Sequence, residues 1–261
     1  MPDEPRTVDL NADLGEANDD AGTAIEQALL GLVTTAHIAC GGHAGDERSM
    51  AKMVRAALAA GVRVGAHPSY PDRVGFGRRP VEMAAPDLAV ALGTQINALV
   101  AVAASVGAEV SSIKPHGALY AEVAHDPLTF DALRDAFVRC CGPDAALVLA
   151  SGSPAVAWAR QAGVAVFEEG FVDRAYTGDG ALVARHEPGS VYSDPERAAS
   201  QALGLAARGT VAAEDGTQLA LHVDTLCLHG DSPNAPAMAR AVRAALGAAG
   251  VVVAAPPAHR H

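Results

Sequence analysis

Lysine occurs at only two of the 261 positions of this chain, and one of them lies where it could take part in chemistry. Lys114 ends a short apolar-flanked segment, residues 109–114, and His116 follows two positions later. Burying an ammonium group is costly unless an acid pairs with it, and that acid would oppose the fall in pKa that burial causes. We favour a catalytic or substrate-orienting role for Lys114. A structural ion pair with a carboxylate of a neighbouring strand is the alternative.

Histidines follow other apolar segments in the same way. His43, His67 and His229 come after such segments, as His116 does. Four histidines together with several carboxylates could bind a divalent metal, or they could act as general acids and bases near neutral pH. The sequence has neither an HxxxH nor an HExxH pair, so both possibilities remain open.

Three polar residues near the N-terminus share one side of a predicted strand. Asp9, Asn11 and Asp13 alternate with apolar residues, so their side chains point the same way. We interpret this face as turned into a barrel, with a solvated edge strand as the alternative. His37 is interpreted as a core histidine, and Cys40 as a small buried thiol rather than a nucleophile.

Residues 71–79 form a glycine-punctuated loop with three arginines, of which Arg78 and Arg79 are our candidates for contacts with a cofactor. Guanidinium groups suit carboxylates and phosphates, although a solvated loop is the alternative. The chain has no Walker-type phosphate loop and no nucleophile elbow for a catalytic serine. Asp46 precedes a long helical pattern, where it serves as an N-cap, as a substrate contact, or as both.

The elements that position these residues alternate between short β-branched runs and helical patterns, which indicates a parallel sheet with crossover helices. We expect strands over residues 7–12, 34–39, 62–66, 109–114, 146–150, 164–167, 219–228 and 251–253. We expect helices near 22–31, 46–60, 84–107, 128–140, 153–162, 195–208 and 233–249. Residues 168–193 are expected to be irregular or to form a hairpin, and Asp215-Gly216 is a hairpin turn signal. In a parallel barrel all strand C-termini meet on one face, so the polar residues converge there.

Composition narrows the class of protein. Acidic residues outnumber basic ones by 30 to 19, and the net charge of −11 argues against nucleic acid or anionic membranes as partners. The four cysteines form no CxxC pair and the N-terminus lacks the apolar core of a secretion signal, so we expect a cytoplasmic protein with reduced thiols. Residues 88–108 carry no charge, but their helical spacing indicates a packed helix rather than a membrane span. We expect one domain over residues 1–261, with a tail that frays from about residue 256.

Six segments of the chain resemble the LamB/YcsF family, in order and over nearly the whole length. They are DLNADLGE at 9–16, IACGGHAGD at 38–46, GAHPSYPDRVGFGRR at 65–79, KPHGALY at 114–120, EGFVDRAY at 169–176 and HGD at 229–231. The resemblance implies a deformed (β/α) barrel with about seven parallel strands, related to the polysaccharide-deacetylase type. It also implies the opening of 5-oxo-L-proline to L-glutamate with hydrolysis of ATP, in a complex with two further subunits, B and C.

The same resemblance implies a set of site residues at the matching positions: Asp13, Glu16, His43, Asp46, His67, Lys114, His116, Glu169, Asp173, Arg174, His229 and Asp231. Within this set we expect Asp13 or Asp46 to act as the general base and His116 as an acid or base. Lys114 and Arg174 are expected to stabilise negative charge that develops on oxygen.

The chain departs from the family pattern at a few positions. The family has Cys, Asn, Phe and Pro where this chain has Ala12, His37, Gly42 and Glu47. Loss of the Phe beside His43 predicts a wider pocket and leaves the choice of lactam open. Two rivals are retained: a metal-dependent deacetylase or other amidohydrolase on the same barrel, and a protein that binds a lactam without turning it over.

Overall fold

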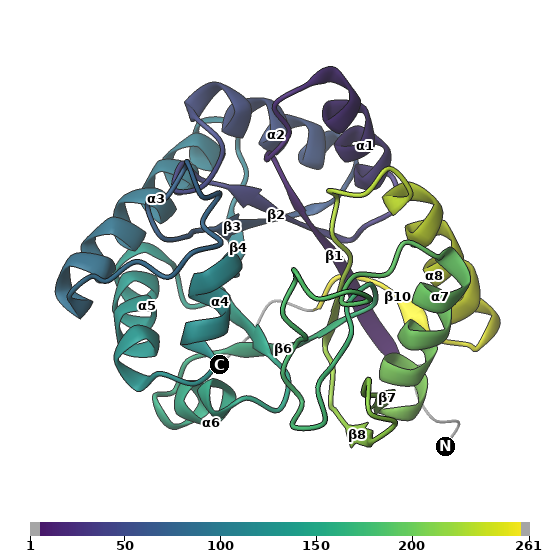
Figure 1. Cartoon of the computed structure of the whole chain (residues 1–261). Helices are drawn as coiled ribbons and strands as arrows, with labels where there is room; N and C mark the ends of the chain where they lie inside the picture. The colour runs from purple at the N-terminus through teal and green to yellow at the C-terminus, as the bar shows by residue number, and fades with distance from the viewer. Residues whose placement is uncertain (1–5, 257–261) are drawn as a thin grey trace, which may run out of the picture.

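A closed barrel of parallel strands forms the centre of the computed structural model, which describes residues 6–256 (Figure 1). Seven of the described strands close it in the order β1, β2, β3, β4, β5, β6, β9 and back to β1, while β10 pairs with the first residues of β1. The strands of this sheet are β1 Thr7–Leu14, β2 Thr35–Ala39, β3 Arg63–His67, β4 Val110–Ile113, β5 Ala146–Ala150, β6 Val166–Phe171, β9 Thr225–Cys227 and β10 Val252–Val253. The predicted barrel of about seven parallel strands is confirmed.

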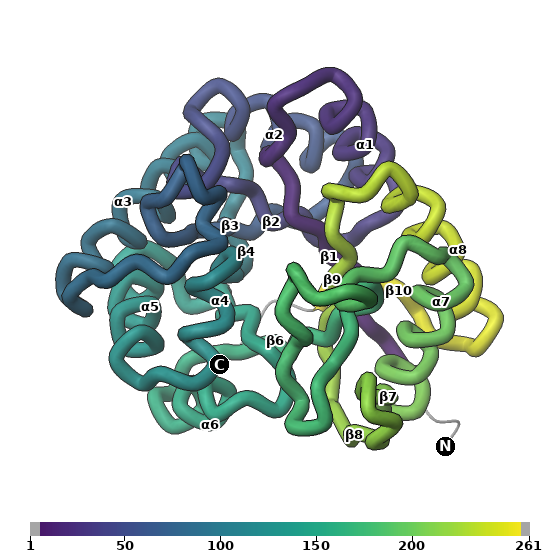
Figure 2. The backbone as a smooth tube through the Cα atoms, in the orientation of Figure 1, coloured from purple at the N-terminus to yellow at the C-terminus, as the bar shows by residue number. Residues whose placement is uncertain are grey.

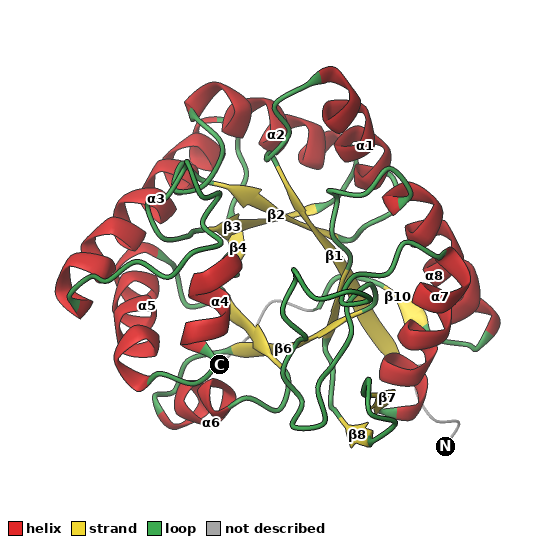
Figure 3. Ribbon diagram, viewed as in Figure 1, coloured by secondary structure: helices red, strands yellow, loops and turns green. Residues whose placement is uncertain are grey.

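Helices surround the barrel and cover its apolar outer surface (Figure 3). They are α1 Asp20–Leu30, α2 Glu47–Ala59, α3 Ala85–Ser105, α4 Gly117–Val123, α5 Pro127–Cys140, α6 Pro154–Gln161, α7 Pro195–Leu203 and α8 Ala235–Ala248. A π-helical turn, η1 Gly204–Arg208, continues α7. Several helices start at an aspartate whose side chain accepts a backbone N–H of the first turn, as Asp126 does from Thr129 at the start of α5.

β1 shows how the barrel separates an apolar layer from a polar interior. Leu10 and its alternate neighbours belong to the core between strands and helices. Asp9 and Asn11 point inward, where Asp9 accepts hydrogen bonds from Thr34, Thr35 and Thr225. β1 pairs with a strand on each side, so the solvated-edge alternative is excluded. The interior is therefore a hydrogen-bonded polar network that ends at the C-terminal mouth.

Helix α3 is the one described helix that is long and apolar enough to cross a membrane by length and composition alone. Leu88, Leu92, Ile96 and Leu99 of this helix are buried at the predicted helical spacing. They form a stripe that belongs to the same core cluster as the barrel strands.

The structure differs from the expected elements in three places. The expected strand over 219–228 is two strands, because Gln218–Ala220 forms β8, which pairs with β7 Thr210–Ala212 across the predicted Asp215-Gly216 hairpin turn. β6 extends to Phe171, so its acidic residues lie inside the strand rather than after it. Helix α4 was not expected.

The segment after β6 returns on itself and borders the barrel mouth. Isolated bridges join Arg174 to Val191 and Tyr176 to Leu182, which confirms the predicted irregular, hairpin-like region. Figure 2 shows this green segment in front of the C-terminal ends of the strands. It supplies one wall of the cavity described next.

Candidate active site

A cavity of about 270 Å³ opens at the C-terminal mouth of the barrel. Most of the predicted site residues line it: Asp13, Glu16, His67, Lys114, His116, Arg174, His229 and Asp231. Arg78 also lines the cavity, together with residues 182–185 of the segment after β6. The convergence of strand ends expected from the parallel barrel therefore brings these residues together around one space.

Lys114 forms the floor of the cavity at the end of β4. Its ammonium Nζ lies 2.9 Å from Asp13 Oδ1 and 2.9 Å from Glu169 Oε1, and it donates to Asn11 Oδ1 at 3.1 Å. Only 2% of Lys114 is exposed. Burial lowers the pKa of this ammonium, but the acids around it, Asp13 first, hold the pKa well above its usual range. Lys114 is thus a fixed positive charge, which suits it to stabilise an anionic oxygen rather than to accept a proton.

The carboxyl of Asp13 responds to the same neighbours. Burial raises its pKa, but His67 and Lys114 outweigh that effect and hold the pKa well below its usual range. Asp13 Oδ2 lies 3.4 Å from His67 Nε2. An ionised carboxylate that is already paired with Lys114 is a weak base, so the structure does not favour Asp13 for proton abstraction.

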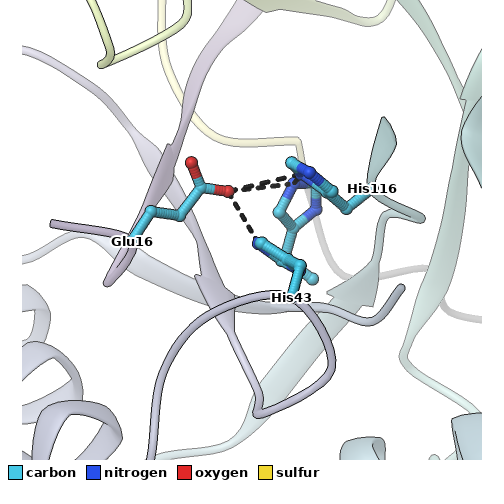
Figure 4. A group of neighbouring side chains, drawn as sticks. Glu16, His43 and His116 are labelled. Carbon is cyan, nitrogen blue, oxygen red and sulfur yellow. Dashed lines mark hydrogen bonds and ion pairs between the residues drawn. The ribbon is translucent and has the colours of Figure 1, made fainter. Parts of the chain in front are cut away.

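Beside this floor, one carboxylate meets three imidazoles. Glu16 Oε1 lies 2.9 Å from His43 Nε2, 3.3 Å from His116 Nδ1 and 3.8 Å from His67 Nε2. The rings of His43 and His116 stack with 3.7 Å between centroids, and both face the Glu16 carboxylate in Figure 4. Burial raises the pKa of Glu16, but the hydrogen bonds from His116 and His43 bring it far below its usual range.

The pKa values of the three imidazoles diverge. Burial lowers the pKa of His43 to about 4, although Glu16 opposes the change. Burial also lowers the pKa of His116. For His67, burial is outweighed by Asp13 and Glu16, which raise its pKa. Neighbouring groups with pKa values pushed apart are typical of functional sites.

A second imidazole–carboxylate pair stands on the opposite wall. Asp173 accepts from His229 through both the backbone N–H, at 2.9 Å, and ring Nδ1, at 3.0 Å. Burial raises the pKa of Asp173, and the contacts with His229 more than reverse this, so the carboxyl stays ionised. Because a carboxylate accepts, Nδ1 carries the hydrogen and Nε2 is left with a lone pair on the cavity side.

Arginines stand at the mouth. Arg78 and Arg185 both pair with Asp231, Arg78 at 3.1 Å. Arg174 donates to the backbone carbonyls of Ser190 and Val183, and so holds the wall segment in place. Arg185 is a functional candidate that we did not predict, because no motif around it distinguishes it within residues 168–193.

Two predicted residues lie elsewhere. Asp46 is exposed and caps α2, where it accepts from Ser49 N while the Ser49 hydroxyl accepts from Asp46 N. The capping role explains Asp46 completely, and its place outside the cavity argues against its expected role as general base. Arg79 pairs with Asp72 at 2.7 Å and does not line the cavity.

Gly42 does not widen the pocket, contrary to expectation. A Cβ at this position would lie 2.3 Å from Gln95 Oε1 and 2.4 Å from Ser69 Oγ. Gln95 accepts from Ser69 N and donates to Ser69 O, so its amide fills the space that a side chain at Gly42 would need. The remaining expectations hold: His37 is buried between Asn11 and Ser112, and Cys40 is a buried thiol whose pKa burial raises to about 12.

Comparisons with known proteins agree with this architecture. The chain is 47% identical over 250 residues to the A component of 5-oxoprolinase from Methylococcus capsulatus, covering 96% of each chain. It is 45% identical to the protein of the same name from Mycobacterium avium, covering 94% of this chain and 97% of the relative.

Solved structures show the same barrel. The lactam utilization protein from Thermus thermophilus superposes with a TM-score of 0.86 at 42% identity, covering 96% of this chain and all of that one. A peptidoglycan deacetylase from Bacillus subtilis shares the fold alone, with a TM-score of 0.50 and 10% identity over 97% of this chain and 88% of that one. The family model for LamB/YcsF matches residues 8–261, and the chain belongs to the LamB/YcsF family.

Proposed function

We propose that this chain is one component of an ATP-dependent 5-oxoprolinase, which hydrolyses the cyclic amide of 5-oxo-L-proline to L-glutamate while ATP goes to ADP and phosphate. Relatives named as the A component of 5-oxoprolinase and a structural neighbour named lactam utilization protein support the proposal. The observation that carries it is the buried Lys114 ammonium on the floor of a small cavity with arginines at its mouth. The 5-oxoprolinase subunits B and C are the partners that these names suggest.

The size and charge of the cavity fit a small anionic lactam. Its volume of about 270 Å³ is below the range typical of sites for drug-sized ligands. Arg78 and Arg185 share the single carboxylate of Asp231, so their guanidinium groups retain donors for a substrate carboxylate or a phosphate. Lys114 faces the same space from below, where it would contact the ring oxygen of a lactam held by those arginines.

The chemistry needs activation because an unstrained lactam is a poor electrophile. Transfer of a phosphoryl group from ATP to the lactam oxygen gives an activated imidate and releases ADP. Water then adds to the ring carbon and loses a proton to a base, phosphate leaves, and cleavage of the C–N bond gives L-glutamate. His229 is our choice for the base, because Asp173 fixes its tautomer and leaves Nε2 able to accept a proton. Lys114 stabilises the oxygen that becomes negative.

A reconstituted assay tests this function. The chain is combined with its partners B and C, ATP and 5-oxoproline, and glutamate and ADP are measured. Lys114→Met should reduce glutamate formation at least about 100-fold, the scale of losing one donor to a developing oxyanion. Lys52→Met, at the exposed lysine of α2, is the matched control and should be fully active.

Arg78→Met separates a catalytic loss from a folding defect, because Arg78 lies on the exposed rim. Circular dichroism of each variant checks that it is folded. Full activity of both the Lys114 and the Arg78 variants would refute the proposed site. Glutamate formed by the chain alone without ATP would instead support an amidohydrolase, and binding with no turnover in the complex would support a protein that only holds the lactam.

A further inference from the structure

Two cavity-lining histidines are each held by a backbone carbonyl through one ring nitrogen. His67 Nδ1 lies 2.7 Å from the carbonyl oxygen of Lys114, and His116 Nε2 lies 2.9 Å from that of Phe76. A carbonyl oxygen can only accept, so both of these nitrogens carry a hydrogen. The neutral rings therefore keep their lone pairs on the other nitrogen, which is Nε2 of His67 and Nδ1 of His116.

These two lone-pair nitrogens face each other at 3.0 Å. Glu16 Oε1 lies 3.3 Å from His116 Nδ1 and 3.8 Å from His67 Nε2, and Asp13 Oδ2 lies 3.4 Å from His67 Nε2. All of these atoms are acceptors in that state, and acceptors that converge in a buried place repel one another unless a cation lies among them. Among the described residues, no lysine or arginine lies within ion-pair distance of Glu16 to supply that charge.

We propose that Glu16, His67 and His116 bind a divalent first-row transition metal such as Zn²⁺, with an open coordination position toward the cavity. A tetrahedral zinc ion with bonds of about 2.0–2.1 Å places its ligand atoms roughly 3.3 Å apart. The separations here are 3.0, 3.3 and 3.8 Å. The rings of His67 and His116 stand at 89° to each other, which lets both lone pairs point at one ion.

His43 belongs to the same cluster but is assigned a different role. Its ring is parallel to that of His116, at 3° and 3.7 Å, so the two in-plane lone pairs cannot meet at one point. His43 does not line the cavity, and its Nε2 donates to Glu16 Oε1. We assign it as a positioning residue that orients the Glu16 carboxylate, as side chains behind metal ligands do.

The loop that orients His116 is held in an uncommon conformation. Phe76, whose carbonyl accepts from His116, has a φ of 54°, a left-handed value that is unfavourable for an aromatic residue. The following Gly77 packs so tightly on the start of α4 that a Cβ on Gly117 would lie 2.5 Å from its oxygen. Strain maintained next to a cavity is typical of functional sites. Here it fixes the tautomer of one proposed ligand.

The donor set also selects the ion. Two imidazole nitrogens and one carboxylate suit Zn²⁺, Co²⁺ or Ni²⁺, whereas Mg²⁺ prefers oxygen ligands and water. A bound ion of this kind would supply Lewis-acid chemistry to a carbonyl oxygen in the cavity. That chemical use rests on the proposed lactam hydrolysis, but metal binding itself does not.

The test measures metal rather than turnover. The full chain is stripped with chelator, dialysed, and titrated with Zn²⁺ or Co²⁺ by calorimetry, while bound metal is counted by mass spectrometry. We expect one equivalent per chain, a visible Co²⁺ absorption band of a low-symmetry site, and no comparable binding of Mg²⁺. Because His259 and His261 are tail histidines that could bind metal adventitiously, both are replaced by alanine in every sample.

Variants locate the site. His67→Gln, His116→Gln and Glu16→Gln should each weaken binding at least about 100-fold, and His43→Gln about tenfold, the lower end for residues behind the ligands. His186→Gln, at a histidine that is 83% exposed, is the matched control and should bind normally. Circular dichroism of each metal-free variant shows whether it is folded.

Each outcome decides the proposal. Absence of binding by the wild-type chain, or undiminished binding by all three ligand variants, overturns it. Nitrogen NMR that shows a proton shared by His67 and His116 in the presence of excess Zn²⁺ also overturns it. Metal binding without lactam turnover in the reconstituted complex would support the metal site and refute the proposed function. Turnover by a metal-free complex supplied with ATP and Mg²⁺ would do the reverse.

Discussion

Replacing Lys114 by methionine isolates the charge that holds the barrel mouth together. Methionine has nearly the volume and length of the lysine stem, so Lys114→Met removes the ammonium without leaving a large cavity. The ammonium lies 2.9 Å from each of Asp13 Oδ1 and Glu169 Oε1. Without it, two buried carboxylates lose their common counter-charge.

The expected loss of stability is large. Removing one partner of a buried ion pair costs about 3–5 kcal/mol, because the remaining charge is buried without compensation. That is a substantial part of the roughly 5–15 kcal/mol that stabilises most folded proteins. Lys52→Met, on the exposed face of α2, should change the free energy of unfolding by less than about 0.5 kcal/mol.

The loss should depend on pH with a defined sign. In the wild type the pKa of Asp13 is below its unfolded value, so its contribution to stability is present above about pH 4 and is lost as the pH falls through the folded value. In Lys114→Met, burial dominates and raises the pKa of the orphaned carboxylates above the unfolded value. Their contribution is then lost as the pH rises, so the deficit should be greater at pH 8 than at pH 5.5.

Urea unfolding in the presence of a chelator measures these free energies. Fluorescence of Trp158, the single tryptophan, and circular dichroism should give coincident transitions. A deficit below about 1 kcal/mol at pH 8, or one that is unchanged between the two pH values, would show that Lys114 is not the counter-charge of these acids. The double variant Lys114→Met/Glu169→Gln should be less destabilised than the sum of the two single variants, because both remove the same interaction.

Other predictions concern single contacts. Asp46→Ala should lower the free energy of unfolding by about 1 kcal/mol, as loss of an N-cap does, and leave glutamate formation in the reconstituted complex unchanged; a large loss of turnover would return Asp46 to the site. If Arg78 binds the substrate carboxylate, Arg78→Met should raise KM for 5-oxoproline by about tenfold with a smaller change in kcat, and a pure fall in kcat would contradict this role. Burial raises the pKa of Cys40 to about 12 and also raises that of Cys227, so a thiol reagent at pH 8 should reach neither until the chain is unfolded.

Much of the barrel could be predicted because its signals are local. The β5 strand begins and ends where its apolar run does, and most other strands agree within about two residues. The failures occur where tertiary contacts override the pattern. Residues 219–228 look like one strand, but β8 pairs away from the barrel with β7, so the run divides before β9. Helix α4 is too short to show a clear helical period.

The site could be predicted as a set but not as a geometry. The rule that parallel strands end on one face brings Asp13, Lys114 and His229 together without any knowledge of distances. The same rule mistook Asp46 for a site residue, because helix caps also follow strand ends. It could not find Arg185, which reaches the cavity from the hairpin-like segment after β6 rather than from a strand end.

The metal cluster shows what lies beyond any reading of side-chain types. Histidines beside a glutamate are compatible with acid–base work or with metal binding, and the sequence leaves the two possibilities equal. What separates them is which ring nitrogen carries the hydrogen, and two backbone carbonyls decide this, those of Lys114 and Phe76. The backbone of Lys114 thus sets the tautomer of His67 while its side chain neutralises Asp13, so one residue prepares both halves of the cavity floor. Lys114→Met keeps the carbonyl, and should therefore weaken the charge network while leaving the metal affinity of the folded variant within about tenfold of the wild type.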